Sequence, residues 1–365
     1  MTRYIIQRVV WIFIILFTTL TITFTLLKLA PEYPPTKNEE KDIWLEKQVQ
    51  DGFYTSVYYN IDDPEDMAEV DYIRANEPGV NQSVFIVTPV RDSGVVKVFY
   101  RVPIITQYFR WVGNIVRDWN WGTSTKIRVN VPAFTIIAER MPLTLYLNLS
   151  ALLFYLPFGF FFGILAALKK DTVVDNILQI LIMVFLSVPS LVLLLTLIII
   201  LSYQFNLLPS LFPLVGIESF GKVAQGFVIP VLAVGLPSIA GLTRILRAEL
   251  SEVLTSEFVL LAKTKGLSHT QAVLRHAIRN SLVPMVPIII GSFAGLLGGS
   301  FILESVYAIP GVGRITLQAL VAGGYDYNVI LVSSAFYSAI GLSTALIVDL
   351  SYGIIDPQIR MGARK

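Results

Sequence analysis

The chain has 365 residues, of which 54% are hydrophobic and 15% are charged, whereas a soluble domain usually carries about 25% charged residues. This composition indicates a membrane protein and leaves little room for a soluble catalytic domain. The absence of cysteine excludes disulfides, thiolate metal sites and cysteine nucleophiles, while the net charge of +2 excludes nothing because acidic and basic residues are segregated along the chain.

Six apolar runs are long enough to cross a bilayer, and we expect each to form a transmembrane helix. They cover residues 9–30, 143–168, 177–203, 227–248, 283–303 and 329–350. Lys and Arg gather before the first run, after the second, after the fourth and after the last, so the positive-inside rule places these segments and both termini in the cytoplasm. The first run is longer than a typical signal-peptide core and no small-residue cleavage site follows it, so we expect a retained span rather than a cleaved signal.

The external segment 31–142 is too long for a simple connection, and we expect it to fold as a small insertion. Its acidic start, KNEEKDIWLEK, is typical of an amphipathic helix or a solvated linker. Two β-rich stretches, QSVFIVTPV and GVVKVFYRV, flank the turn residues RDSG at Arg91–Gly94 and predict a hairpin. The stretch PAFTIIAERMP, residues 132–142, predicts an interfacial helix entering the second span. Spacer and partner-binding roles both remain open for the insertion.

Prolines in the third and fourth apolar runs predict kinks or breaks at membrane depth. Irregular backbone is tolerated there where it is buried or faces a cavity, so the residues around these prolines are candidates for helix packing or for a pathway. The residues concerned are Ser187, Pro189, Ser190, Pro230, Pro237 and Ser238.

The fifth run carries small residues on one face, with Gly291, Gly295 and Gly299 four residues apart and Ser292 beside them. Small residues let another helix approach closely. This face therefore packs within the chain, or it lines a pathway or meets a second subunit.

Between the fourth and fifth runs lies a loop, residues 255–282, with clear helix signals. Ser256 and Glu257 suit a helix start, Gly266 can end that helix in a left-handed conformation, and Ser268 with Gln271 forms a capping-box pattern for a second helix. An ordered helix pair is predicted. Its basic residues fit either a membrane surface or insertion into a groove on another protein.

Three other features of the sequence are interpreted without a catalytic, metal-binding or nucleotide-binding role. The chain's two histidines, His269 and His276, have no acidic or thiol companions, so we expect solvated side chains and no metal site. Asp349, near the end of the last run, is interpreted as an interfacial anchor paired with a basic residue rather than as a proton relay. The stretch GIESFGKV resembles a phosphate-binding loop but ends in Val223 and lies in an external loop, so we expect no ATP binding by this chain.

At this point the residues resemble a known family. KTKGLSHTQAVLRHAIRNSLVP is similar to the cytoplasmic EAA-type loop of ABC importer permeases, in the spacing variant of the oligopeptide, dipeptide and nickel group. Further blocks match in order: RYIIQRVVWIFIILF and LLKLAPEYP, QYFRWVGNIVRDWNWGTS, ERMPLTLYLNLSALLFYLPFGFFFGILAAL, ESVYAIPGVGR and VDLSYGIIDPQIR. Together they resemble the B-type peptide permease subunit. The chain departs from the family in Leu260 and Leu261, where the motif begins with Glu and Ala, and in an insertion at about 35–100.

The resemblance implies an all-α membrane protein with six transmembrane helices and a cytoplasmic coupling-helix loop, to which this chain's own residues add a small extracytoplasmic insertion that has room for β-structure. Its divisions are residues 1–30 with the first span, 31–142 with the insertion, and 143–365 with the permease core. In the coupling loop, Ala262 and Gly266 occupy the family's small-residue positions. The residues implied to couple to an ATPase are Glu257, Ala262, Lys265, Gly266, Leu267, Ser268, Gln271, Arg275 and Arg279.

The same resemblance implies that the chain forms half of a translocation pathway for oligopeptides or dipeptides in a bacterial or archaeal-type plasma membrane. Its implied partners are a second homologous permease, two ATP-binding cassette ATPase subunits that hold ATP and Mg, and an extracytoplasmic peptide-binding protein. No cofactor is expected on this chain, which is not an enzyme by itself.

Three alternatives stay open. A nickel or other small-solute importer would favour His or Met near the pore, and here no histidine lies in a predicted span. A secondary transporter would favour membrane-embedded carboxylates and an internal repeat, neither of which is evident. A structural or signalling membrane protein would tolerate disruption of the loop 255–282.

Overall fold

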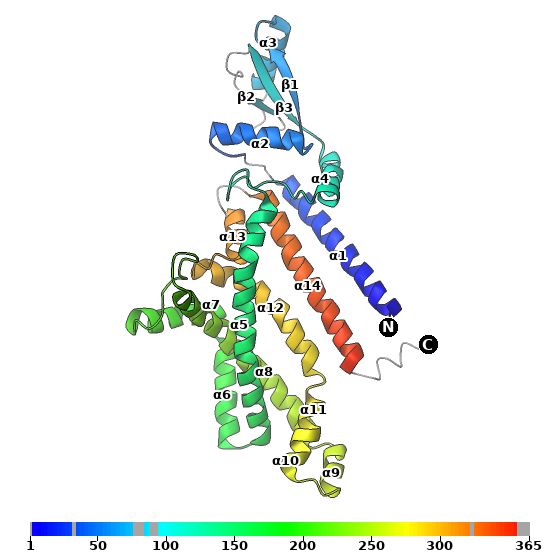
Figure 1. Cartoon of the computed structure of the whole chain (residues 1–365), viewed down its shortest axis with the longest axis vertical. Coiled ribbons are helices and arrows are strands. Elements are labelled where there is room, and N and C mark those ends of the chain that lie inside the picture. The colour runs from blue at the N-terminus through cyan, green and yellow to red at the C-terminus, as the bar shows by residue number, and fades with distance from the viewer. Residues whose placement is uncertain (1, 31–33, 76–83, 88–93, 322–324, 356–365) are drawn as a thin grey trace. The chain divides into compact units, whose positions relative to one another are not determined.

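The computed structural model of the chain describes residues 2–30, 34–75, 84–87, 94–321 and 325–355 (Figure 1). The structure is mostly helical, with one small sheet. It divides into two compact units. Unit 1 comprises Met1–Ile12, Pro142–Arg314 and Ala339–Lys365, and unit 2 comprises Phe13–Met141 and Ile315–Ser338.

The expected membrane fold is confirmed. Four helices are long and apolar enough to cross a bilayer alone: α1 (Thr2–Leu29), α5 (Ala133–Leu168), α8 (Phe220–Leu254) and α14 (Tyr327–Ile355). Two bent helix pairs pass the same test, so the count reaches the predicted six when each pair is one span. The first pair joins α6 (Val173–Ser187) to α7 (Ser190–Leu197) and its π-helical continuation η1 (Ile198–Gln204). The second joins Thr270–Ser281 to Met285–Gly295 with a bend of 52°, and only its second half, at the start of α12 (Met285–Val306), falls in the predicted fifth span.

The third predicted span, residues 177–203, is not one straight helix. Its two halves are bent by 98° at Val188 and Pro189. Proline has no N–H for the helix ladder and disfavours helical backbone in the residue before it, and Val188 is accordingly extended, with φ −87° and ψ 120°. The predicted break at Pro189 is confirmed, whereas Pro230 and Pro237 lie within the continuous helix α8.

In unit 1, α5 and α8 pack closely through glycines on α5. An added Cβ at Gly159 would lie 2.6 Å from a side-chain carbon of Leu242, and one at Gly163 would lie 2.9 Å from Leu246. Their four-residue spacing is the small-residue pattern that lets membrane helices approach. This intramolecular contact was not predicted, because the sequence analysis assigned that pattern only to the fifth run.

The insertion in unit 2 combines helices with a three-stranded antiparallel sheet of order β1-β3-β2. Its elements are α2 (Asn38–Gln50), β1 (Tyr54–Asn60), α3 (Pro64–Ala75), β2 (Val84–Val87) and β3 (Val95–Arg101). The predicted hairpin is confirmed as β2 paired with β3, with Val84 opposite Tyr100, although residues 88–93 of its turn lie outside the described part of the chain. The predicted acidic helix is confirmed as α2, which buries Trp44 and Leu45.

Strand β1 was missed. Its sequence, YTSVYYN, mixes polar and aromatic residues without a clear alternation, and its pairing with β3 comes from a distant part of the chain, with Tyr54 opposite Arg101.

The segment predicted as an interfacial helix, 132–142, is helical and continuous with the second span, because α5 begins at Ala133 and continues through Pro142 without a break. Its position at the interface stays a prediction. A separate amphipathic helix, α4 (Ile104–Asp118), precedes it in unit 2.

The start of α14 is tied to the loop before α5 within unit 2. The fully buried carboxylate of Asp326 accepts hydrogen bonds from Ser124 Oγ at 2.6 Å and from the backbone N–H groups of residues 125–127 at 3.0–3.2 Å. These bonds satisfy a buried charge that would otherwise be costly. Helix α13 (Val312–Val321) lies shortly before this contact in the chain.

Candidate functional site

The predicted helix pair forms at the end of α8 in unit 1 (Figure 1). It consists of α9 (Glu257–Thr264) and a second helix built from α10 (His269–Ala272), the π-helical turn η2 (Val273–Ala277) and α11 (Ile278–Ser281). Its inner face is anchored. Val259 and Ala262 of the first helix and Ala272 and Ala277 of the second are buried in a cluster that includes Leu250 of α8.

The turn between the two helices depends on one glycine. Gly266 has φ +91°, a left-handed conformation that side chains rarely adopt, and an added Cβ would meet no described atom within 4 Å. The predicted left-handed helix end is therefore confirmed. The constraint at Gly266 is backbone conformation, not lack of space.

The second helix begins with the predicted capping box. Gln271 N–H donates to Ser268 Oγ at 3.3 Å, and Ser268 N–H donates to Gln271 Oε1 at 3.2 Å. At the first helix the start at Glu257 is confirmed but the side-chain cap is not, because Ser256 Oγ donates back to Val253 O at 2.5 Å. The geometry of the pair is therefore set by Gly266 and the Ser268–Gln271 box.

The outer face of the pair combines exposed apolar and basic residues. Leu261 is 55% exposed and Leu274 62% exposed, and Phe258 also lies open. The predicted coupling residues divide between the two faces. Ala262 is buried and Leu267 half-buried, whereas Glu257, Lys265, Gly266, Ser268, Gln271, Arg275 and Arg279 are exposed. Such a rigid surface can dock into a groove on a partner.

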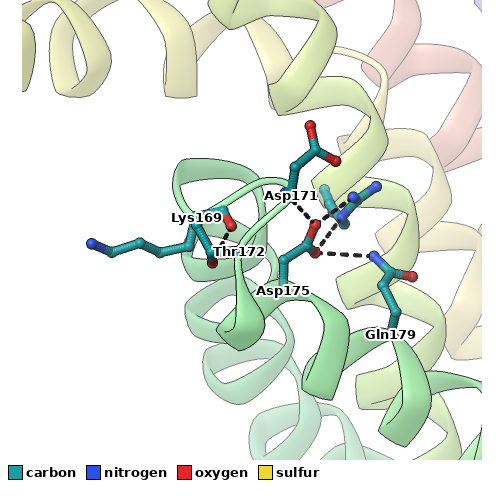
Figure 2. Close-up of polar contacts among 6 residues, drawn as sticks. Lys169, Asp171, Thr172, Asp175 and Gln179 are labelled. Atoms are coloured by element: carbon teal, nitrogen blue, oxygen red, sulfur yellow. Dashed lines mark hydrogen bonds and ion pairs between the residues drawn. The ribbon is translucent and has the colours of Figure 1, made fainter.

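An ion pair that was not predicted from the sequence joins α6 and α8 in unit 1 (Figure 2). Arg247 of α8 donates from Nε to Asp175 Oδ1 at 2.7 Å and from Nη2 to Oδ2 at 2.6 Å. The Asp175 side chain is 1% exposed, and it also accepts from Asp171 N–H at 3.0 Å and from Gln179 Nε2 at 3.3 Å. Two-point pairing with additional bonds is the geometry in which Arg and carboxylate bind most strongly.

The pair fixes the beginning of α6 to α8 near the end that leads into α9. The signal for it was an arginine inside the fourth predicted apolar run, where a charged residue calls for a partner. We expect this contact to make α6 and α8 move as one body.

A second missed carboxylate is Glu304, which is fully buried at the end of α12. Thr144 Oγ1 donates to it at 2.9 Å and Arg314 N–H at 3.2 Å, while Val312 N–H donates to Thr144 Oγ1 at 2.8 Å. An added Cβ at Gly311 would lie 2.5 Å from Thr144 Oγ1, so the chain can close on this carboxylate only with glycine there. The stretch ESVYAIPGVGR thus folds around its own glutamate.

The predicted pathway candidates lie in or next to α6, α7, α8 and α12, and a pathway role for them stays a prediction. Ser187 and Ser238 donate to carbonyls of their own helices, those of Met183 and Val234, and Ser190 begins α7. In α12, Ser292 contacts Tyr155 of α5, and Gly299 lies further along the same helix.

The structure shows what surrounds two of the glycines on the small-residue face of α12. An added Cβ at Gly291 or Gly295 would meet no described atom within 4 Å. Within the described part of the chain, no helix packs on these two glycines. The open space at these two glycines is compatible with the pathway or subunit interpretation, which stays a prediction, while Ser292 of the same face packs within the chain against Tyr155.

Two further features that the sequence singled out lie outside the loop: Asp349 and the stretch that resembles a phosphate-binding loop. Asp349 Oδ2 lies 3.2 Å from Arg8 Nη1, which confirms the predicted pairing with a basic residue. In the stretch resembling a phosphate-binding loop, Lys222 Nζ donates to Glu218 at 2.9 Å and Gly221 lies at the start of α8. Among the residues that the structure describes, no three His, Asp or Glu side chains form a group that could hold a metal ion.

The chain is similar to known transport proteins. Residues 159–361 match the sequence profile of the binding-protein-dependent transport system inner membrane component. The chain is 35% identical to a dipeptide transport system permease protein of Lactococcus lactis over 71% of this chain and 82% of that protein. It is 26% identical to a dipeptide transport system permease protein of Bacillus subtilis over 99% of both chains. A solved methionine ABC transporter in an inward-facing conformation is similar with a TM-score of 0.49 and 17% identity, over 61% of this chain and 97% of that chain.

Proposed function

The chain belongs to the family of binding-protein-dependent transport system inner membrane components, and on this premise we propose that it is the permease subunit of an ABC importer for oligopeptides or dipeptides. It is a multi-pass membrane protein and forms half of the translocation pathway. The peptide substrate is supported by relatives that are named dipeptide or oligopeptide transport system permeases.

The observation that carries the mechanism is the helix pair at the end of α8. Its inner face is buried and its outer face is apolar and basic, as a rigid docking element requires. We assign this pair to the cytoplasm, together with both termini, because of the basic clusters. ATP and Mg bind to two separate ATPase subunits that receive the outer face in a groove.

Movement then passes from the ATPases into the membrane helices. Closure of the ATPases shifts the helix pair, and α8 carries α6 with it through the Asp175–Arg247 pair. The membrane helices rock between inward-open and outward-open arrangements. Differential contact with the ATPases in the two arrangements provides the coupling energy.

The second permease is proposed to meet the open face of α12 at Gly291 and Gly295. An extracytoplasmic binding protein delivers the peptide to the side that carries the insertion. Because the pathway is shared between two permeases, Ser187, Ser190 and Ser238 remain candidates for lining it.

Uptake in the native host tests the substrate. Deleting this chain should abolish ATP-dependent uptake of radiolabelled dipeptides and short oligopeptides through this importer, and expressing the chain again should restore it. Uptake of labelled nickel should not change. Loss of nickel uptake with unchanged peptide uptake would assign the chain to a small-solute importer instead, and no change in either would contradict an import role.

A further inference from the structure

Helix α4 carries an apolar surface that nothing in the proposed mechanism uses. Ile105, Phe109 and Val116 are 64%, 67% and 78% exposed, and Val112 between them is half-buried. The spacing of these four residues places them on one stripe of the helix. Three large side chains in a row are more apolar surface than a water-exposed helix of this length usually presents.

A neighbouring side of the same helix is packed against the membrane-spanning helix α1 inside unit 2. The rings of Trp111 and Phe24 stack at 4.8 Å, Tyr108 meets Phe17 at 6.4 Å, and the hydroxyls of Tyr108 and Thr21 are 2.8 Å apart. These contacts hold α4 beside α1, and Arg110 and Asn114 add hydrogen bonds to the carbonyls of Gly52 and Asp51.

The contacts also set the depth of α4. The apolar span of α1 ends at Leu29. At 1.5 Å of rise per residue, Phe24 lies about 7 Å and Phe17 about 18 Å inside that end. A helix held at this level has its free face at the membrane surface or just below it, where a stripe of Ile, Phe and Val is not in contact with bulk water.

Charge identifies what lies over the stripe. Arg110 and Arg117 stand on the exposed side of α4 next to it, and the one acidic residue of the helix is Asp118 at its last position. A shallow hollow of about 520 Å³ is lined by Ile105, Thr106, Phe109, Arg110, Gly113, Asn114 and Arg117. It thus combines apolar side chains with the guanidinium group of Arg117 and with that of Arg110, whose Nη1 also donates to Gly52 O, and guanidinium groups bind phosphate well.

A series of aromatic side chains lies beside the C-terminal end of α4. Trp111, Trp121, Trp119 and Phe134 form a chain of edge-to-face contacts with ring centroids 5.5–6.3 Å apart. Tryptophan is enriched at the boundary between bilayer and water. The aromatic chain therefore supports an interfacial position for α4.

We propose that α4 is an interfacial helix that binds an anionic phospholipid of the bilayer. Ile105, Phe109, Val112 and Val116 lie against acyl chains, and Arg110 and Arg117 hold the phosphate of the headgroup. This site anchors the insertion to the membrane surface. The inference requires only that α1 spans the membrane. It does not depend on which substrate the importer transports.

Spin labelling tests the acyl contact directly, since the chain contains no cysteine and single-cysteine variants need no background substitutions. Labels at Phe109→Cys and Val116→Cys are compared with one at Glu65→Cys in α3, in nanodiscs of phosphatidylglycerol and phosphatidylcholine. We expect the α4 labels to collide more with oxygen than with a water-soluble nickel chelate, and the α3 label to show the reverse. Preferential collision with the chelate would place the stripe in water and overturn the proposal.

The same labels in the complete importer distinguish lipid from protein. Low accessibility to both reagents would mean that a subunit covers α4, which also overturns the proposal. For the headgroup, native mass spectrometry measures phosphatidylglycerol retained by the purified chain. Arg117→Gln should reduce retention, whereas Lys222→Gln, an exposed cation in unit 1, should not; equal retention by both variants would contradict the headgroup contact.

Discussion

Gly266→Val is expected to abolish peptide-stimulated ATP hydrolysis and peptide uptake by the assembled importer, while the chain still accumulates in the membrane. A β-branched residue at φ +91° is strained, so the turn must open or shift and the two helices no longer present one rigid face. Because allosteric coupling energies are commonly about 1–3 kcal/mol, a lost docking geometry should reduce stimulated hydrolysis by about 5- to 150-fold. ATP hydrolysis in proteoliposomes with and without peptide and binding protein measures this effect.

The matched control is Gly216→Val. Gly216 has φ +86°, and an added Cβ there would also meet no described atom within 4 Å, so the local strain is the same. It lies outside the helix pair, however, in the segment before α8. We expect uptake to persist in Gly216→Val. Equal loss in both variants would attribute the effect to general strain, and wild-type uptake by Gly266→Val would contradict the coupling role.

Asp175→Asn is expected to produce the largest loss of stability among single substitutions in unit 1. The change removes the charge that Arg247 meets at 2.6 and 2.7 Å and leaves a guanidinium in an apolar helix with a side chain only 23% exposed. Breaking a buried ion pair by removing one partner costs about 3 kcal/mol or more. Thermal unfolding of the purified chain in detergent, followed by tryptophan fluorescence, measures the loss.

Two further variants make that measurement specific. Asp349→Asn is the same substitution at another Arg–Asp pair, but that pair has one 3.2 Å contact and side chains 44% and 27% exposed, so its loss should cost at most about 1 kcal/mol. The double variant Asp175→Asn/Arg247→Met removes both charges and should recover part of the stability. Equal destabilisation by Asp175→Asn and Asp349→Asn would contradict a structural role for the buried pair.

Local signals in the sequence predicted local structure well. Gly266 and the Ser268–Gln271 box define the helix pair through contacts only a few residues apart, and the apolar runs define the spans through length alone. Pro189 likewise predicted the break in the third span. In each case the physical cause lies within one or two helical turns of the residue that signals it.

Contacts between distant residues were the ones missed. Asp175 meets Arg247, Glu304 meets Thr144, and β1 pairs with β3, and none of these partners can be chosen from one sequence without the fold. The small-residue pattern likewise does not reveal from the sequence which helix, if any, packs against it. Gly159 and Gly163 pack against α8 while Gly291 and Gly295 face open space, although both pairs have the same spacing.

The most direct test of the account is affinity purification of the tagged chain from native membranes, with mass spectrometry of stoichiometric companions. The wild-type chain is predicted to recover a second permease and ATPase subunits. The variant Leu261→Glu/Leu274→Glu changes only side chains that are 55% and 62% exposed, so it should retain the second permease and lose the ATPases. Recovery of the wild-type chain alone, or undiminished ATPase recovery with the variant, would contradict docking through the outer face of the helix pair.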